Sequence, residues 1–155
     1  MDQLYPLLQT QLESGGVARL VVTGSSMVPT LQSRRDAVCL QLPDKPLKKG
    51  DIILYKRENG QFVLHRIVSV PVDGTFFCCG DNQWEKETVS QAQVLSVVSA
   101  LIRGGKTVTE DSGLPLLWAK CWVAFLPVRR PLLALRRRAG KIKRYLTHKY
   151  KGVCL

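Results

Sequence analysis

Three polar residues, Ser26, His65 and Asp81, are of the types that together perform nucleophilic catalysis. A serine hydroxyl becomes a strong nucleophile when a neighbouring base takes its proton. An imidazole suits that role because its ordinary pKa lies near neutrality. A carboxylate on the other ring nitrogen fixes the tautomer of the imidazole. Such triads are defined by geometry and not by chain order, so we predict that these three residues form one.

The residues around Ser26 place it at the end of a strand. Residues 17–23 are rich in β-branched side chains and predict a strand that Gly24 ends. Pro29 suits the first turn of a short helix, because that position needs no N–H. We therefore expect free backbone N–H groups near Gly24 and Ser25 to form an oxyanion hole. The alternative is that Ser25 and Ser26 merely cap the helix.

His65 lies within a strong strand pattern over residues 61–70. Alternation in that strand places His65 on one face with Val63 and Ile67, and Arg66 on the other face. A histidine on an apolar face is also compatible with a purely structural role in the core.

Asp81 follows a predicted strand over residues 75–79, which Gly80 ends. The sequence Gly80-Asp81-Asn82 is also an ordinary turn signal. Taken singly, the three polar residues are therefore compatible with a cap, a core histidine and a turn. Their order and shared context favour the catalytic interpretation.

Four short segments resemble the sequence boxes of the signal peptidase I family and of its self-cleaving SOS and phage repressor relatives. The segments are residues 26–31 (Ser-Met-Val-Pro-Thr-Leu), 49–54 (Lys-Gly-Asp-Ile-Ile-Leu), 64–68 (Leu-His-Arg-Ile-Val) and 79–82 (Cys-Gly-Asp-Asn). The resemblance covers about residues 17–103. It implies a β-rich fold of coiled sheets and serine peptidase activity.

The resemblance also assigns roles position by position. It implies that Ser26 is the nucleophile, and that His65 replaces the lysine base of bacterial signal peptidases, as in the endoplasmic-reticulum and archaeal types. It implies that Asp81 is the aspartate of the histidine-using types and that Asp51 is a supporting, structural aspartate. Signal peptidases usually carry Ser or Thr where this chain has Gly24, so the oxyanion hole is expected to rely on backbone N–H groups or on another side chain.

The strand patterns predict a mainly β, β-rich α+β fold with antiparallel sheets or a partly closed barrel. A short helix is expected over residues 1–12. Asn59-Gly60 and Asp73-Gly74 are strong hairpin signals, and Gly104-Gly105 predicts a further turn. The expected strands cover residues 17–23, 37–42, 51–56, 62–70, 75–79, 94–102 and 107–109.

The net charge of +11 is concentrated near the C-terminus. Residues 1–111 carry 12 basic and 12 acidic side chains, whereas residues 112–155 carry 11 basic and no acidic ones. We therefore predict a catalytic domain over residues 1–112 and a basic, helical C-terminal segment over residues 113–155. Residues 132–146 form an amphipathic pattern that suits an anionic membrane surface, an acidic partner or packing on the domain.

Five cysteines without regular spacing predict free thiols and a reducing compartment. The chain has only two histidines and no Cys-x-x-Cys, so we predict no metal and no cofactor. Residues 1–16 lack the apolar run of a membrane anchor. A cytoplasmic location is expected, with peripheral contact at the inner membrane face as an alternative.

Together these features predict a serine-type endopeptidase that cleaves a leader, signal or pro-peptide on a peptide or protein substrate. The alternative is a non-catalytic regulatory module of the same fold, tethered to a membrane or to nucleic acid by its basic segment. We do not expect a nucleic-acid partner for the enzyme. The cleavage-site residues and the oligomeric state are left open by the sequence.

Overall fold

The structure is a computed structural model that describes residues 5–109, 121–125, 128 and 131. Helix α1 (Tyr5–Glu13) comes first, and the short 3-10 helix η1 (Gln91–Gln93) directly precedes the longest strand. The strands are β1 (Ala18–Val21), β2 (Ala37–Gln41), β3 (Ile52–Lys56), β4 (Phe62–Ser69), β5 (Phe76–Cys79), β6 (Glu87–Val89), β7 (Val94–Arg103) and β8 (Lys106–Thr109).

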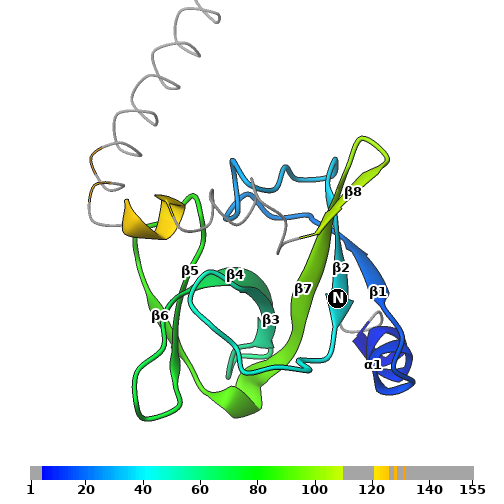
Figure 1. Cartoon of the computed structure of the whole chain (residues 1–155), viewed down its shortest axis with the longest axis horizontal. Helices are drawn as coiled ribbons and strands as arrows, with labels where there is room; N and C mark the ends of the chain where they lie inside the picture. The colour runs from blue at the N-terminus through cyan, green and yellow to red at the C-terminus, as the bar shows by residue number, and fades with distance from the viewer. Residues whose placement is uncertain (1–4, 110–120, 126–127, 129–130, 132–155) are drawn as a thin grey trace, which may run out of the picture.

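These strands form one eight-stranded antiparallel sheet in the order β1-β2-β7-β3-β4-β5-β6, with β8 paired to β7. The order ends at β1 and β6, so the sheet is not closed into a barrel. Helix α1 lies beside β1, whereas β5 and β6 lie at the opposite side of the molecule (Figure 1). The prediction of a mainly β fold is confirmed.

The predicted hairpin turns join neighbouring strands. Gly60 adopts a positive φ of 84° between β3 and β4, which is a conformation that glycine reaches without steric cost. Asp73 begins the turn between β4 and β5, where its side chain accepts a hydrogen bond from the Thr75 N–H at 3.0 Å. These local signals therefore position β3, β4 and β5 next to one another.

Two features of the sheet differ from the sequence prediction. Strand β6 was not predicted, because its three residues are mostly polar and only Val89 is buried. The long strand β7 pairs with both β2 and β3, which lie far from it in the sequence. Turn signals report only local connections, so the sequence pattern could not reveal this central position of β7.

Two apolar clusters hold the sheet together. One joins α1, β1, β2 and β7 to the loop that follows β1, and it includes the fully buried Met27 and Leu31 of that loop. The other cluster lies between β3, β4, β5 and β6 and includes Ile53, Tyr55 and Ile67. The loop that carries Ser26 is therefore anchored in the core.

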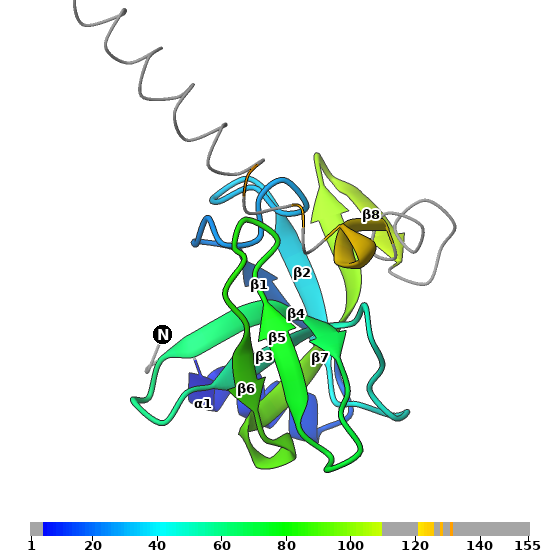
Figure 2. The ribbon, with the colours of Figure 1, turned by 90° about the vertical axis from the view of Figure 1, so that its left-hand side faces the viewer.

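The described part of the C-terminal segment contacts the β-rich domain. Residues 121–124 are helical (Figure 2). Val123 is buried against Val68 and Cys79. The Trp122 indole N–H donates a hydrogen bond to the Asp81 carbonyl oxygen at 3.1 Å. The predictions for residues 113–120 and for the amphipathic pattern over residues 132–146 lie outside the described residues.

Two further predictions concern cysteines and membrane spans. Cys39, Cys78, Cys79 and Cys121 are free thiols, as predicted. Within the ranges that the structure describes, the helices are too short or too polar to cross a bilayer.

Candidate active site

Ser26 lies in the loop between β1 and β2 and is half-buried. The loop runs through consecutive turns rather than the predicted short helix, and the Val28–Pro29 peptide bond is cis. The next residue, Met27, is buried in the core, as is Leu31 four positions later. These two apolar side chains hold the loop on the sheet, while Ser26 itself borders solvent.

Ser26 and His65 both line one groove, which has a volume of about 340 Å³. One wall is formed by the consecutive residues 20–24, which belong to β1 and its extension, and the other by residues 61–65 at the start of β4. Strand β1 ends the sheet, and β4 begins to pair with β5 only at Arg66. Both walls therefore carry a strand edge that the described sheet does not use.

Gly80 is the point at which the Ser26 loop and the His65 ring come together. A methyl group on Gly80 would lie 2.7 Å from the Ser26 carbonyl oxygen, 2.8 Å from Gln83 Oε1 and 3.0 Å from His65 Nε2. The next residues strengthen the junction, because the Asn82 N–H donates to the Ser26 carbonyl oxygen at 2.6 Å. The Ser26 carbonyl oxygen and His65 Nε2 therefore both lie next to Gly80.

His65 is buried, with 2% of its surface exposed. Burial lowers the pKa of its imidazole to about 4, because the charged form loses hydration. The carboxylates of Glu87 and Asp81 favour the charged form and oppose this effect, whereas Arg57 adds to it. His65 is therefore neutral at physiological pH and able to accept a proton.

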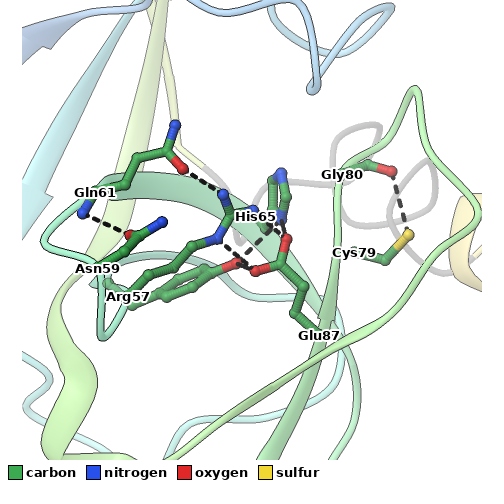
Figure 3. Close-up of polar contacts among 8 residues, drawn as sticks. Arg57, Asn59, Gln61, His65, Cys79, Gly80 and Glu87 are labelled. Carbon is green, nitrogen blue, oxygen red and sulfur yellow. Dashed lines mark hydrogen bonds and ion pairs between the residues drawn. The ribbon is translucent and has the colours of Figure 1, made fainter.

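The Nδ1 side of His65 faces Tyr55 and Glu87. His65 Nδ1 lies 3.2 Å from the Tyr55 hydroxyl oxygen and 3.5 Å from Glu87 Oε1. Tyr55 donates its hydroxyl proton to Glu87 Oε2 at 3.0 Å. The Glu87 carboxylate contacts both the Arg57 guanidinium and the His65 ring, as the dashed lines of Figure 3 show.

Asp81 does not occupy the predicted place beside His65 Nδ1. Its fully buried carboxylate instead accepts two hydrogen bonds from Arg66, from Nε to Oδ1 at 3.0 Å and from Nη2 to Oδ2 at 2.9 Å. The Thr30 hydroxyl donates to the same Oδ2 atom. The physical reason is that Arg66 is also buried, on the opposite face of β4 from His65, and its charge requires a partner there.

Asp81 therefore connects β4, which carries His65, to the loop that carries Ser26. Arg66 is the neighbour of His65 on β4, and Thr30 lies four residues after Ser26. Through these two contacts the Asp81 carboxylate holds together the two elements that carry His65 and Ser26. The structure thus differs from the prediction in the contact partners of Asp81, which are Arg66 and Thr30 and not the His65 imidazole.

The predicted supporting residues have different positions. Gly24 borders the groove, and the exposed Ser25 accepts a hydrogen bond from Asn82 Nδ2 at its carbonyl oxygen. Asp51 closes the turn before β3, where Oδ2 accepts the Lys48 N–H at 2.8 Å, outside the lining of the groove. The hydroxyl of Ser26 makes no hydrogen bond with any residue that the structure describes, His65 included.

Sequence reasoning missed Tyr55, Arg57 and Glu87 at this site. Tyr55 had a usable signal, since alternation along the strand over residues 51–56 places it on the same face as Ile53. Glu87 had no usable sequence signal, because its short strand was not recognised. Arg57 pairs with Glu87 through Nε at 2.7 Å and through Nη2, and the pairing lowers the pKa of Glu87.

Comparisons with protein-family models and with curated protein sequences find no match for this chain.

Proposed function

We propose that this chain is a serine endopeptidase with Ser26 as nucleophile and His65 as general base. The observation that carries the proposal is the junction at Gly80, where the Ser26 loop and His65 Nε2 meet at the edge of a groove. His65 is buried and neutral, and the half-buried Ser26 lines the same groove. In the proposed reaction the Ser26 hydroxyl comes within hydrogen-bond distance of His65 Nε2 when the peptide binds. The resemblance of residues 26–31, 64–68 and 79–82 to signal peptidase boxes supports the same chemistry.

The proposed reaction has two stages. Ser26 Oγ attacks the carbonyl carbon of the scissile peptide while its proton passes to His65 Nε2. Backbone N–H groups of the loop from Gly24 to Ser26 stabilise the resulting oxyanion. The imidazolium then protonates the leaving amine as the C–N bond breaks, and water hydrolyses the acyl-enzyme with His65 again as base. The carboxylates of Glu87 and Asp81 favour the transient positive charge on His65.

The groove fits an extended peptide. Its two walls present the unused edges of β1 and of the first half of β4, so a peptide in β conformation can pair with either edge. Apolar side chains, including those of Leu20, Leu54 and Leu64, line the groove between these edges. An extended, unfolded segment such as a leader or pro-peptide is therefore the proposed substrate.

A peptide library analysed by mass spectrometry tests the proposal. The wild-type chain should cleave library members at internal peptide bonds, and Ser26→Ala should abolish cleavage. Ser14→Ala is a matched control, because it removes an exposed hydroxyl at the end of α1. Equal cleavage by wild type and Ser26→Ala would contradict the proposal. Peptide binding without cleavage by wild type would favour the alternative, a non-catalytic module.

A further inference from the structure

The hydrogen-bond network behind His65 determines which ring nitrogen carries the proton. Arg57 donates to both carboxylate oxygens of Glu87, and this pairing keeps Glu87 ionised. An ionised carboxylate only accepts hydrogen bonds. The 3.0 Å contact between Tyr55 Oη and Glu87 Oε2 therefore uses the single hydroxyl proton of Tyr55.

With its proton directed to Glu87, the Tyr55 oxygen can only accept a hydrogen bond from His65. The 3.2 Å contact between Tyr55 Oη and His65 Nδ1 consequently requires a proton on Nδ1. A neutral imidazole has one N–H, so Nε2 carries the lone pair. Nε2 is the nitrogen that faces Gly80 and the Ser26 loop.

We propose that Glu87 and Tyr55 are positioning residues that hold His65 in the Nδ1–H tautomer, with Glu87 acting through the Tyr55 hydroxyl. This inference rests on the proposed function for its catalytic meaning. Three elements contribute charges around the imidazole: Glu87 on β6, Arg57 after β3 and Asp81 after β5. The Asp81 carboxylate accepts hydrogen bonds from Arg66 and Thr30, so the groups that contact His65 Nδ1 are Glu87 and Tyr55.

The network has a distinctive consequence for Glu87→Ala. Without its carboxylate acceptor, the Tyr55 hydroxyl turns its proton toward His65 Nδ1. The imidazole then becomes the Nε2–H tautomer, which cannot accept the Ser26 proton. Removing the hydroxyl as well, in Tyr55→Phe/Glu87→Ala, eliminates the competing donor and allows the Nδ1–H tautomer again. The double variant is therefore expected to be more active than Glu87→Ala.

The experiment combines ¹⁵N NMR of the histidine side chains with kinetics near neutral pH, where His65 is neutral. The chain has only two histidines, so His148→Gln assigns the signals. We expect Nδ1–H in wild type, Nε2–H in Glu87→Ala, and a mixture with partial return of Nδ1–H in the double variant, which has neither the competing donor nor the acceptor. Peptide cleavage should fall about 100-fold in Glu87→Ala, as expected for the loss of a general base, and recover at least tenfold in the double variant. Glu85→Ala is the matched control on an exposed neighbour.

The tautomer and the peptidase activity have separate readouts. A proton on Nε2 in wild type, or an unchanged tautomer in Glu87→Ala, would overturn the positioning role even if peptides are cleaved. The predicted tautomers without cleavage by wild type would overturn the proposed function and leave the network intact. Loss of dispersed NMR signals would identify a variant that fails to fold, and Tyr55→Phe, which removes only a hydroxyl, then serves as the reference. Tyr55→Phe keeps the Glu87 carboxylate, whose Oε1 atom lies 3.5 Å from His65 Nδ1, so this variant should retain the Nδ1–H tautomer that Glu87→Ala loses. The same Nε2–H tautomer in Tyr55→Phe and in Glu87→Ala would overturn the inference that the freed Tyr55 proton is what displaces Nδ1–H.

Discussion

The buried pair of Asp81 and Arg66 gives the sharpest energetic prediction. Both side chains are at most 2% exposed, and both carboxylate oxygens are hydrogen-bonded to the guanidinium. Asp81→Leu leaves the Arg66 charge buried without its partner, and Arg66→Met does the same to Asp81. Because removing one partner of a buried pair costs about 3–5 kcal/mol, each variant should lose that much free energy of unfolding.

The double variant Arg66→Met/Asp81→Leu removes both charges, so most of the loss should be recovered. Urea unfolding followed by circular dichroism measures the three free energies, with the exposed Asp44→Ala as control. The coupling between the two sites should be at least about 2 kcal/mol. Additive losses, or a loss below about 1 kcal/mol in Asp81→Leu, would refute the stabilising role of the Asp81–Arg66 pair. Peptide cleavage by the double variant should return to within about tenfold of wild type, because only the charge of Asp81 that favours the His65 imidazolium is lost, whereas disabling a triad aspartate costs about 10⁴-fold.

Two further predictions concern Gly80 and His65. Gly80→Ala should reduce kcat/KM by at least about tenfold, because the new methyl group would push the Ser26 carbonyl and His65 Nε2 apart. Thr88→Ala on the surface of β6 is a suitable control, whereas a change at the exposed Gly24 is not. Equal rates for wild type, Gly80→Ala and Thr88→Ala would contradict the steric argument. Burial lowers the pKa of His65 from its ordinary value of 6.5 to about 4, so its contribution to the free energy of unfolding should fall by about 3 kcal/mol as the pH drops from 6.5 to 4. Urea titrations across this range should show a shallower pH dependence in His65→Gln, and identical slopes in both proteins would contradict the buried, neutral state.

The fold was largely predictable because its signals are local. Asn59-Gly60 and Asp73-Gly74 mark the turns of two hairpins. The strands beside them show alternating apolar and polar residues or continuous apolar runs, and such patterns depend on neighbouring residues alone. The position of β7 between β2 and β3 depends on contacts between distant segments, so no local pattern reports it. Strand β6 was missed because it has only three residues and a single buried one.

At the site, residue type predicted the candidates more reliably than their contacts. Ser26 and His65 line the same groove, whereas Asp81 pairs with Arg66 rather than with His65. Alternation in the strand over residues 61–70 places Arg66 on the face opposite His65, but only the structure shows that Arg66 is buried there. A buried guanidinium needs a carboxylate, and Asp81 satisfies that need. Glu87 could not be predicted, because its place beside His65 depends on the pairing of β6 with β5.

The most direct test of the central claim is the site of reaction with a fluorophosphonate, a reagent that modifies activated serines. After incubation of the full chain near neutral pH, peptide mapping by mass spectrometry should locate one phosphonate adduct on Ser26. The adduct should form at least about 100-fold more slowly in His65→Gln, which lacks the base. An unmodified Ser26, or equal rates of modification with and without His65, would contradict an active site built from these two residues.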